Sequence, residues 1–223
     1  MAERSIAKKI ARLLGPLILA SIIIAILSLA SDLSEISLLQ KFQSGSIADR
    51  SEIDRLAASN DNRQAVVAYV ALAVFATTLV SFFVWLNQSN KLARAAGAQG
   101  LRFSPGWTVG CFFIPIINLW KPYQAVADIW KASKNPAGIG AVATGDIVVV
   151  WWILFLVSSA ASNAAFRVAL RAEEIDELIR SGWVSCVSSG LDIVYYLITL
   201  VLVREINRGL WVADLTSSEE GIA

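Results

Sequence analysis

The 223-residue sequence contains no histidine and only two cysteines, Cys111 and Cys186. Histidine is the commonest metal ligand and the commonest general base, so its absence excludes Ser-His-Asp triads and histidine metal sites. Two thiols cannot supply the four ligands of a cysteine-only zinc site. Glycine-rich phosphate loops and paired catalytic carboxylates are also missing. These absences predict a protein that is not an enzyme and that carries no metal or cofactor.

Charged residues are scarce as well. They make up 17% of the chain, against about 25% in soluble domains, whereas hydrophobic residues make up 56%. The mean hydropathy is +0.60. A formal net charge of +1 gives no overall field that would attract nucleic acid, so no nucleic-acid partner is expected.

Four apolar runs are long enough to cross a bilayer, and they cover residues 13–30, 65–86, 143–166 and 184–203. At a helical rise of about 1.5 Å per residue, each spans roughly 30 Å, the thickness of the hydrocarbon core. In lipid such runs must be helical to satisfy their own backbone groups. The first run exceeds the length of a secretory signal, about 7–15 residues, and is interpreted as a retained anchor. We predict an all-α integral membrane protein that forms one domain over residues 1–223.

The distribution of basic residues predicts the orientation of these spans. Basic residues are dense before the first run, between the second and third, and after the fourth, whereas the other two connections hold most of the acids. Cytoplasmic segments are enriched in lysine and arginine, so both termini should be cytoplasmic and the connections after the first and third runs external. This topology separates Cys111 from Cys186 and excludes a disulfide between them.

The two external connections share a short pattern. Glu52-Ile53-Asp54-Arg55-Leu56 recurs as Glu174-Ile175-Asp176-Glu177-Leu178, and the same offset places the second run on the fourth. One interpretation is a parallel repeat about an axis along the membrane normal, each half containing a short external amphipathic helix. The alternative is that any exposed amphipathic helix can contain such a pattern.

The inner connection at 103–133 is apolar up to Trp120, yet it contains Pro105, Gly106, Pro115 and Pro122. Two prolines close together argue against one straight span, because a proline inside a helix costs about 3 kcal/mol. We therefore predict a cytoplasmic-side hairpin with a first helix over 107–114, a break at 115–118 and a second helix from Pro122, a residue suited to a first turn.

The second helix of this hairpin is predicted to be amphipathic. Val126, Ile129 and Trp130 share a face, whereas Asp128 and the lysines lie elsewhere. Trp107, Trp120 and Trp130 are typical of the headgroup level, as is Trp85. Two interpretations remain: an interfacial belt with a sharp turn, or a re-entrant element that lines a cavity.

The same segment carries a resemblance to a known family. The motif residues that carry it are Pro105, Gly106, Trp107, Pro115, Asn118, Trp120, Pro122 and Trp130, with Ser104 before them and Val203-Arg204-Glu205-Ile206 near the end. On these residues the sequence resembles the bacterial multi-pass membrane family catalogued as domain of unknown function 4328, over about residues 65–208. This resemblance implies a multi-pass protein of the bacterial cytoplasmic (inner) membrane, and it implies no reaction. Cys111 departs from the family pattern, in which an aromatic residue is expected.

Asp146 and Asp192 interrupt the third and fourth runs. An aspartate at the centre of a span costs about 2.5–3.5 kcal/mol on insertion scales, so each requires a physical reason. Asp146 lies within one turn of a helix start, where the helix dipole favours an anion. Asp192 is deeper, and its expected partners are Arg167, Asn163, Ser188 or a tyrosine. These residues form the candidate intramembrane polar site, either a structural pair or a proton or cation site.

Two functions follow from these features. The first is a structural membrane component that interacts with lipids, with a protein partner or with further copies of itself, through the tryptophan-rich basic hairpin. The second is a small transporter or channel that uses Asp192 and the broken helix at Pro115–Asn118. The two differ in whether Asp192 faces a hydrated cavity or a packed interior.

Overall fold

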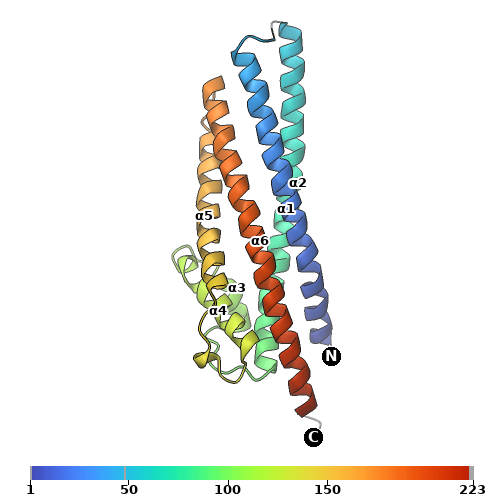
Figure 1. Cartoon of the computed structure of the whole chain (residues 1–223), viewed down its shortest axis with the longest axis vertical. Coiled ribbons are helices and arrows are strands. Elements are labelled where there is room, and N and C mark those ends of the chain that lie inside the picture. The colour runs from blue at the N-terminus through green and yellow to red at the C-terminus, as the bar shows by residue number, and fades with distance from the viewer. Residues whose placement is uncertain (1, 48, 221–223) are drawn as a thin grey trace. The chain divides into compact units, whose positions relative to one another are not determined.

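A computed structural model describes the backbone of residues 2–47 and 49–220, and the side chains of residues 8–47 and 49–210. Every regular element in this described part is helical (Figure 1). In chain order the elements are α1 (Ala2–Gln43), α2 (Arg50–Ala95), α3 (Pro105–Gly110), the 3-10 helix η1 (Ile117–Leu119), α4 (Lys121–Lys134), the 3-10 helix η2 (Ile139–Ala141), α5 (Asp146–Ala169) and α6 (Ile175–Glu220).

The predicted all-α membrane fold is confirmed. Four helices, α1, α2, α5 and α6, are long and apolar enough to cross a membrane. All four predicted runs lie in these helices, except that the third run begins three residues before α5. Much of the apolar surface of these helices is exposed, as is expected of helices whose surroundings are lipid.

The predicted short external helices are not separate elements. The Glu52–Leu56 segment lies in the first turns of α2, and Ile175 begins α6, so each acidic segment continues directly into a long helix. The physical reason in α2 is the absence of a breaker, because residues 50–95 contain neither glycine nor proline, and residues 175–220 of α6 contain no proline. Both α2 and α6 have 46 residues and begin within two residues of their Glu-Ile-Asp pattern. The internal repeat stays a prediction.

The chain divides into two compact units. Unit 1 contains Met1–Ile18, Thr77–Ile153 and Ile198–Ala223, and unit 2 contains Leu19–Ala76 and Leu154–Leu197. Each of the four long helices contributes residues to both units, whereas α3 and α4 belong entirely to unit 1.

Unit 2 contains two antiparallel helix pairs with a defined register. In the first, Ser31 of α1 donates to Gln64 of α2 at 3.0 Å, and Asn60 of α2 donates to Glu35 of α1 at 3.0 Å. The contact therefore moves four residues forward along α1 as it moves four residues back along α2, which is the register of an antiparallel pair. The polar residues of this cluster therefore satisfy one another at the α1–α2 contact.

The second pair, α5 and α6, is also antiparallel with a defined register. The rings of Phe155 and Tyr195 are 6.1 Å apart, Ser158 donates to Asp192, and the hydroxyls of Ser162 and Ser188 are 3.0 Å apart. The contact therefore moves seven residues forward along α5, from 155 to 162, as it moves seven residues back along α6, from 195 to 188. This spacing is that of a helical seam in which residues three and four apart share a face.

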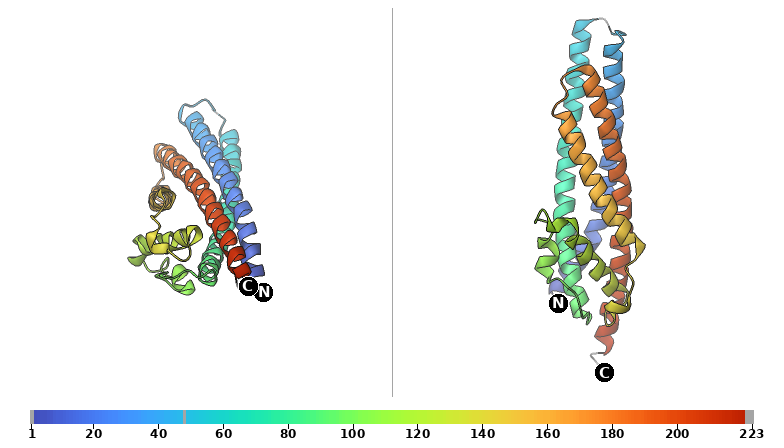
Figure 2. Two further views of the ribbon diagram at one scale, coloured as in Figure 1. Left: turned by 60° about the horizontal axis from the view of Figure 1, so that its bottom comes forward. Right: turned by 90° about the vertical axis from the view of Figure 1, so that its left-hand side faces the viewer.

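Unit 1 packs α4 against the ends of the long helices (Figure 2). Val126 and Ile129 of α4 are fully buried, as are Trp85 of α2 and Trp151 of α5. Trp85 is thus buried in protein rather than exposed on the surface, and its expected depth at the headgroup level stays a prediction. Its indole is in the core and donates to Asn207 of α6 at 2.8 Å, which satisfies the buried N–H.

A glycine sets the distance between α4 and α6. A Cβ added at Gly209 would lie 2.1 Å from the carbonyl oxygen of Ser133, so no side chain fits between the two backbones. Gly209 thus allows the last turn of α4 to approach α6 closely.

Candidate functional site

Side chains at the end of α2 fix the start of the inner connection. Asn90 donates to the carbonyl of Phe103 at 3.1 Å and to the hydroxyl of Thr108 at 2.9 Å. Arg94 donates to the same carbonyl at 2.8 Å, and Asn87 donates to the carbonyl of Pro105 at 2.8 Å. These bonds hold residues 103–108 against α2 with their backbone acceptors satisfied.

The first short helix has different bounds from those predicted. Instead of covering 107–114, α3 runs from Pro105 to Gly110. Ser104 is its N-cap, with a hydroxyl that accepts from the Trp107 amide at 3.4 Å, and Pro105 occupies the first turn. Serine at an N-cap followed by proline is typical of a helix start. Ser104-Pro105 therefore indicates a start at 105, two residues before the predicted one.

The predicted break is real and longer than expected. Turns after Cys111 lead into η1, and α4 begins at Lys121 with Pro122 in its first turn, in agreement with the predicted second helix. The backbone of the break bonds to itself, for example from the Asn118 amide to the Ile114 carbonyl at 2.7 Å. Irregular backbone that is removed from water requires such internal satisfaction.

The break presents exposed apolar side chains. We call the set of Phe113, Ile116, Leu119 and Trp120 the break surface; Phe113 is 69% exposed and Ile116 is 71% exposed. Residues of the break surface also contact the long helices: the Phe113 ring is 5.3 Å from that of Phe83, and the Trp152 indole donates to the Leu119 carbonyl at 3.3 Å. Phe83 lies three residues before the end of its apolar run, about 5 Å along the helix, so the break lies where that run ends.

An ion pair joins the start of the connection to α4. The guanidinium of Arg102 donates to both carboxylate oxygens of Asp128, at 2.7 and 3.0 Å, and the Arg102 amide donates to Asp128 at 3.1 Å. The Asp128 side chain is 7% exposed and that of Arg102 is 48% exposed. Hydrogen bonding to Asp128 raises the pKa of Arg102 above its ordinary value.

Sequence reasoning missed this pair by placing Asp128 on the polar face of its helix. The residue is buried because its charge is matched by Arg102. One signal was available, since Asp128 is the only acid between residues 87 and 145, within a strongly basic segment.

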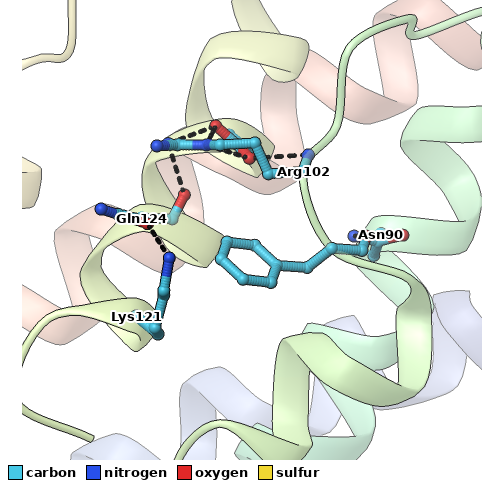
Figure 3. A network of polar contacts seen from close by, with 6 residues as sticks. Asn90, Arg102, Lys121 and Gln124 are labelled. Atoms are coloured by element: carbon cyan, nitrogen blue, oxygen red, sulfur yellow. Dashed lines mark hydrogen bonds and ion pairs between the residues drawn. The ribbon is translucent and has the colours of Figure 1, made fainter. Parts of the chain in front are cut away.

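A pocket of about 330 Å³ opens beside this pair. Its lining residues are Arg102, Phe103, Ser104, Trp107, Cys111, Ile117 and Lys121. The ammonium of Lys121 bonds to the Gln124 side chain at 3.3 Å and lies 5.7 Å from the centre of the Phe103 ring. Arg102 and Lys121 both reach Gln124, Arg102 at its carbonyl and Lys121 at its amide oxygen (Figure 3).

Cys111 forms part of the pocket wall. The residue is 1% exposed, and its thiol lies 3.5 Å from the carbonyl of Thr108, to which it donates. Burial raises the pKa of this thiol above its ordinary value, so the thiolate is disfavoured. Cys111 therefore contributes apolar volume to the wall rather than a nucleophile.

The comparison with known families decides the affiliation of the chain. The model described as Domain of unknown function (DUF4328) matches residues 49–208. The chain belongs to this family. The predicted affiliation is thereby confirmed, and the match begins earlier than the expected residue 65. No curated protein and no solved structure matches the chain.

The match to DUF4328 covers the helices that build the pocket. It begins one residue before α2 and ends within α6, so it includes α3, the break and α4. Among the motif residues that carried the resemblance, Trp107 lines the pocket and Trp120 belongs to the break surface. Pro122 is buried in α4, and Trp130 packs closely on Gly145, where an added Cβ would lie 2.4 Å from its ring.

The candidate intramembrane polar site of this DUF4328 chain is assembled differently from the prediction. Asp192 accepts a hydrogen bond from Ser158 of α5, and it forms no ion pair with Arg167 among the residues that the structure describes. The α5–α6 register explains this, because Arg167 lies nine residues beyond Ser158, about 13 Å along the helix.

The other two members of that predicted site also lie apart from Asp192. Asn163 is exposed, and it lies five residues after Ser158, which turns it to a different side of α5. Asp146 is the first residue of α5 and belongs to unit 1, in agreement with its expected position at a helix start.

Proposed function

We propose that this chain is a multi-pass component of the bacterial cytoplasmic membrane, with no enzymatic activity, whose break surface enters the inner leaflet and contacts lipid. The observation that carries the proposal is the exposure of Phe113, Ile116, Leu119 and Trp120 at the level where the apolar run of α2 ends. An exposed apolar cluster of this kind marks an interaction surface. At a membrane boundary, the simplest partner for such a surface is lipid.

Charge supports the proposed orientation. The same segment carries Lys121 directly after the apolar cluster, and Lys131 and Lys134 in the last turn of α4. Aromatic and apolar side chains inserted beside lysines are typical of helices that lie in the membrane interface on anionic leaflets. With both termini cytoplasmic, this basic segment faces the cytoplasmic leaflet.

Transport through Asp192 is less well supported. Its carboxylate accepts a hydrogen bond from Ser158 within the α5–α6 seam, which ties the group to the packing of the two helices. We therefore infer a structural role for Asp192 in holding α5 to α6.

Spin labelling in lipid nanodiscs tests the proposed membrane contact. In a background with Cys111→Ser and Cys186→Ser, a spin label is attached at Phe113→Cys, and a matched control label is attached at the exposed loop residue Ala137→Cys. We expect the Phe113 label to be accessible to oxygen and shielded from a water-soluble nickel complex, and the Ala137 label to show the reverse. Equal nickel accessibility at both positions would refute the proposal.

A further inference from the structure

We propose that the pocket between α3 and the start of α4 binds one anionic phospholipid, with its phosphate at Lys121 and its glycerol and upper acyl chain against the pocket wall. The inference rests on the proposed lipid contact and deepens it, because it names a binding site, a charged residue and a lipid class. The break surface provides general contact with the leaflet, whereas the pocket would select among headgroups.

The charge of the pocket favours an anionic ligand. Two cations line it, but the charge of Arg102 is neutralised by Asp128, which makes a bidentate pair with it. Lys121 has no carboxylate within ion-pair distance in the part of the chain that the structure describes, and its hydrogen-bond partner is the neutral amide of Gln124. The pocket therefore presents one unneutralised positive charge, which complements an anionic headgroup.

The apolar wall of the pocket favours an amphiphilic ligand. Phe103, Trp107, Cys111 and Ile117 make most of the lining apolar. A small hydrated anion such as inorganic phosphate would gain nothing from these side chains, whereas an amphiphile gains by burying apolar surface on them. The chemistry of the lining thus favours a molecule with a negative end and an apolar body.

The volume of the pocket and its position beside the break surface fit a single phospholipid. A volume of about 330 Å³ accommodates a headgroup with its glycerol, but not two complete acyl chains. The chains must leave the pocket, and Ile117 in the wall adjoins Ile116 of the exposed break surface. A lipid seated at Lys121 can therefore extend its chains over the break surface into the leaflet.

The expected selectivity follows from the charge. A basic residue near an anionic lipid surface contributes about 1 kcal/mol, which corresponds to a preference of about fivefold. Phosphatidylglycerol should therefore be retained about fivefold over phosphatidylcholine, whose choline group would be repelled by Lys121.

Native mass spectrometry of the purified full chain, with equal amounts of the two lipids added in detergent, measures this preference. Lys121→Gln should abolish it. Lys121→Arg should preserve it, because the charge remains. The matched control is Lys41→Gln, which removes an exposed lysine in the last turn of α1, outside both the pocket and the basic segment, and should leave the preference unchanged. Melting of each variant in detergent shows whether it is folded.

Excess inorganic phosphate separates lipid from a free anion. Bound phosphatidylglycerol should withstand it, and displacement by phosphate would instead indicate a small-anion site and overturn the inference. Equal retention of both lipids by the wild-type chain, or an unchanged preference in folded Lys121→Gln, would also overturn it. If the Phe113 spin label is still shielded from nickel in that case, the inference fails while the proposed function stands; if the label is exposed to water, the proposed function itself fails.

Discussion

At the scale of single residues, the Arg102–Asp128 pair has unequal members. Asp128 is buried and Arg102 is half-exposed, so the loss of stability should differ according to which partner is removed. Without Arg102, a carboxylate remains in the protein interior with its main donors gone. Without the charge of Asp128, Arg102 can still be hydrated.

The first prediction follows from this asymmetry. Arg102→Gln should destabilise the protein by about 1–3 kcal/mol, the cost of leaving a buried polar group unsatisfied. Asp128→Asn should cost less, because asparagine can still accept from the Arg102 guanidinium and the exposed part of Arg102 reaches water. Thermal unfolding in one detergent measures both variants. A larger loss in Asp128→Asn than in Arg102→Gln would show that the burial argument is wrong.

The second prediction concerns Ser158 and Asp192. Hydrogen bonds between membrane helices couple by about 0.6 kcal/mol on average, with a maximum of about 1.7. A double-mutant cycle of Ser158→Ala and Asp192→Asn should therefore give a coupling energy of this size in detergent unfolding, and each variant should stay folded. The control cycle pairs Asp192→Asn with Arg167→Gln and should give no coupling. Coupling confined to Arg167 would restore the ion pair that the α5–α6 register argues against.

At the scale of elements, the sequence predicted most where one physical rule dominates. Long apolar runs must be helical in lipid, so the four runs in the sequence predicted the four long helices. Pro122 likewise indicated the start of α4, because proline suits a first helical turn. These features depend only on local composition.

Features that depend on three-dimensional contacts could not be predicted in the same way. The pocket requires Arg102 and Lys121 to be brought together by the break, and the partner of Asp192 depends on the register of α5 and α6. Shifting that register by one helical turn would place another residue opposite Asp192. No local pattern in the sequence specifies the register, because it results from the packing of the whole seam.

The third prediction tests the contact between α4 and α6. Gly209→Ala should destabilise the protein by about 1–3 kcal/mol, because the added methyl would overlap the Ser133 carbonyl and force α4 away from α6. Gly190→Ala is the matched control on the same helix, where nothing lies within 4 Å of an added Cβ. That control should be neutral or stabilising by up to about 1 kcal/mol, since alanine favours helix over glycine. Equal effects at the two glycines, measured by thermal unfolding, would contradict the close contact.

At the scale of the whole molecule, four spans require the two ends of the chain to lie on the same side of the membrane. The connections between the long helices carry exposed positions that report on topology. Between α1 and α2 the exposed Ser46 is available, and between α5 and α6 the exposed Arg171 is available. Ala137 lies after α4, in the connection expected on the cytoplasmic side.

The fourth prediction is the resulting labelling pattern. With Cys111 and Cys186 replaced by serine, single cysteines at Ser46 and Arg171 should react with a membrane-impermeant maleimide in intact cells, and a cysteine at Ala137 should react only after the membrane is opened. The reason is the distribution of lysine and arginine, which favours the cytoplasm for the segment that contains Lys121, Lys131 and Lys134. Both native thiols are buried, so the unmodified chain should show little labelling and serves as the control. Reaction of Ala137 in intact cells together with protection of Arg171 would mean that residues 103–133 cross the bilayer. That outcome would require five spans and would remove the basis for placing the pocket in the cytoplasmic leaflet.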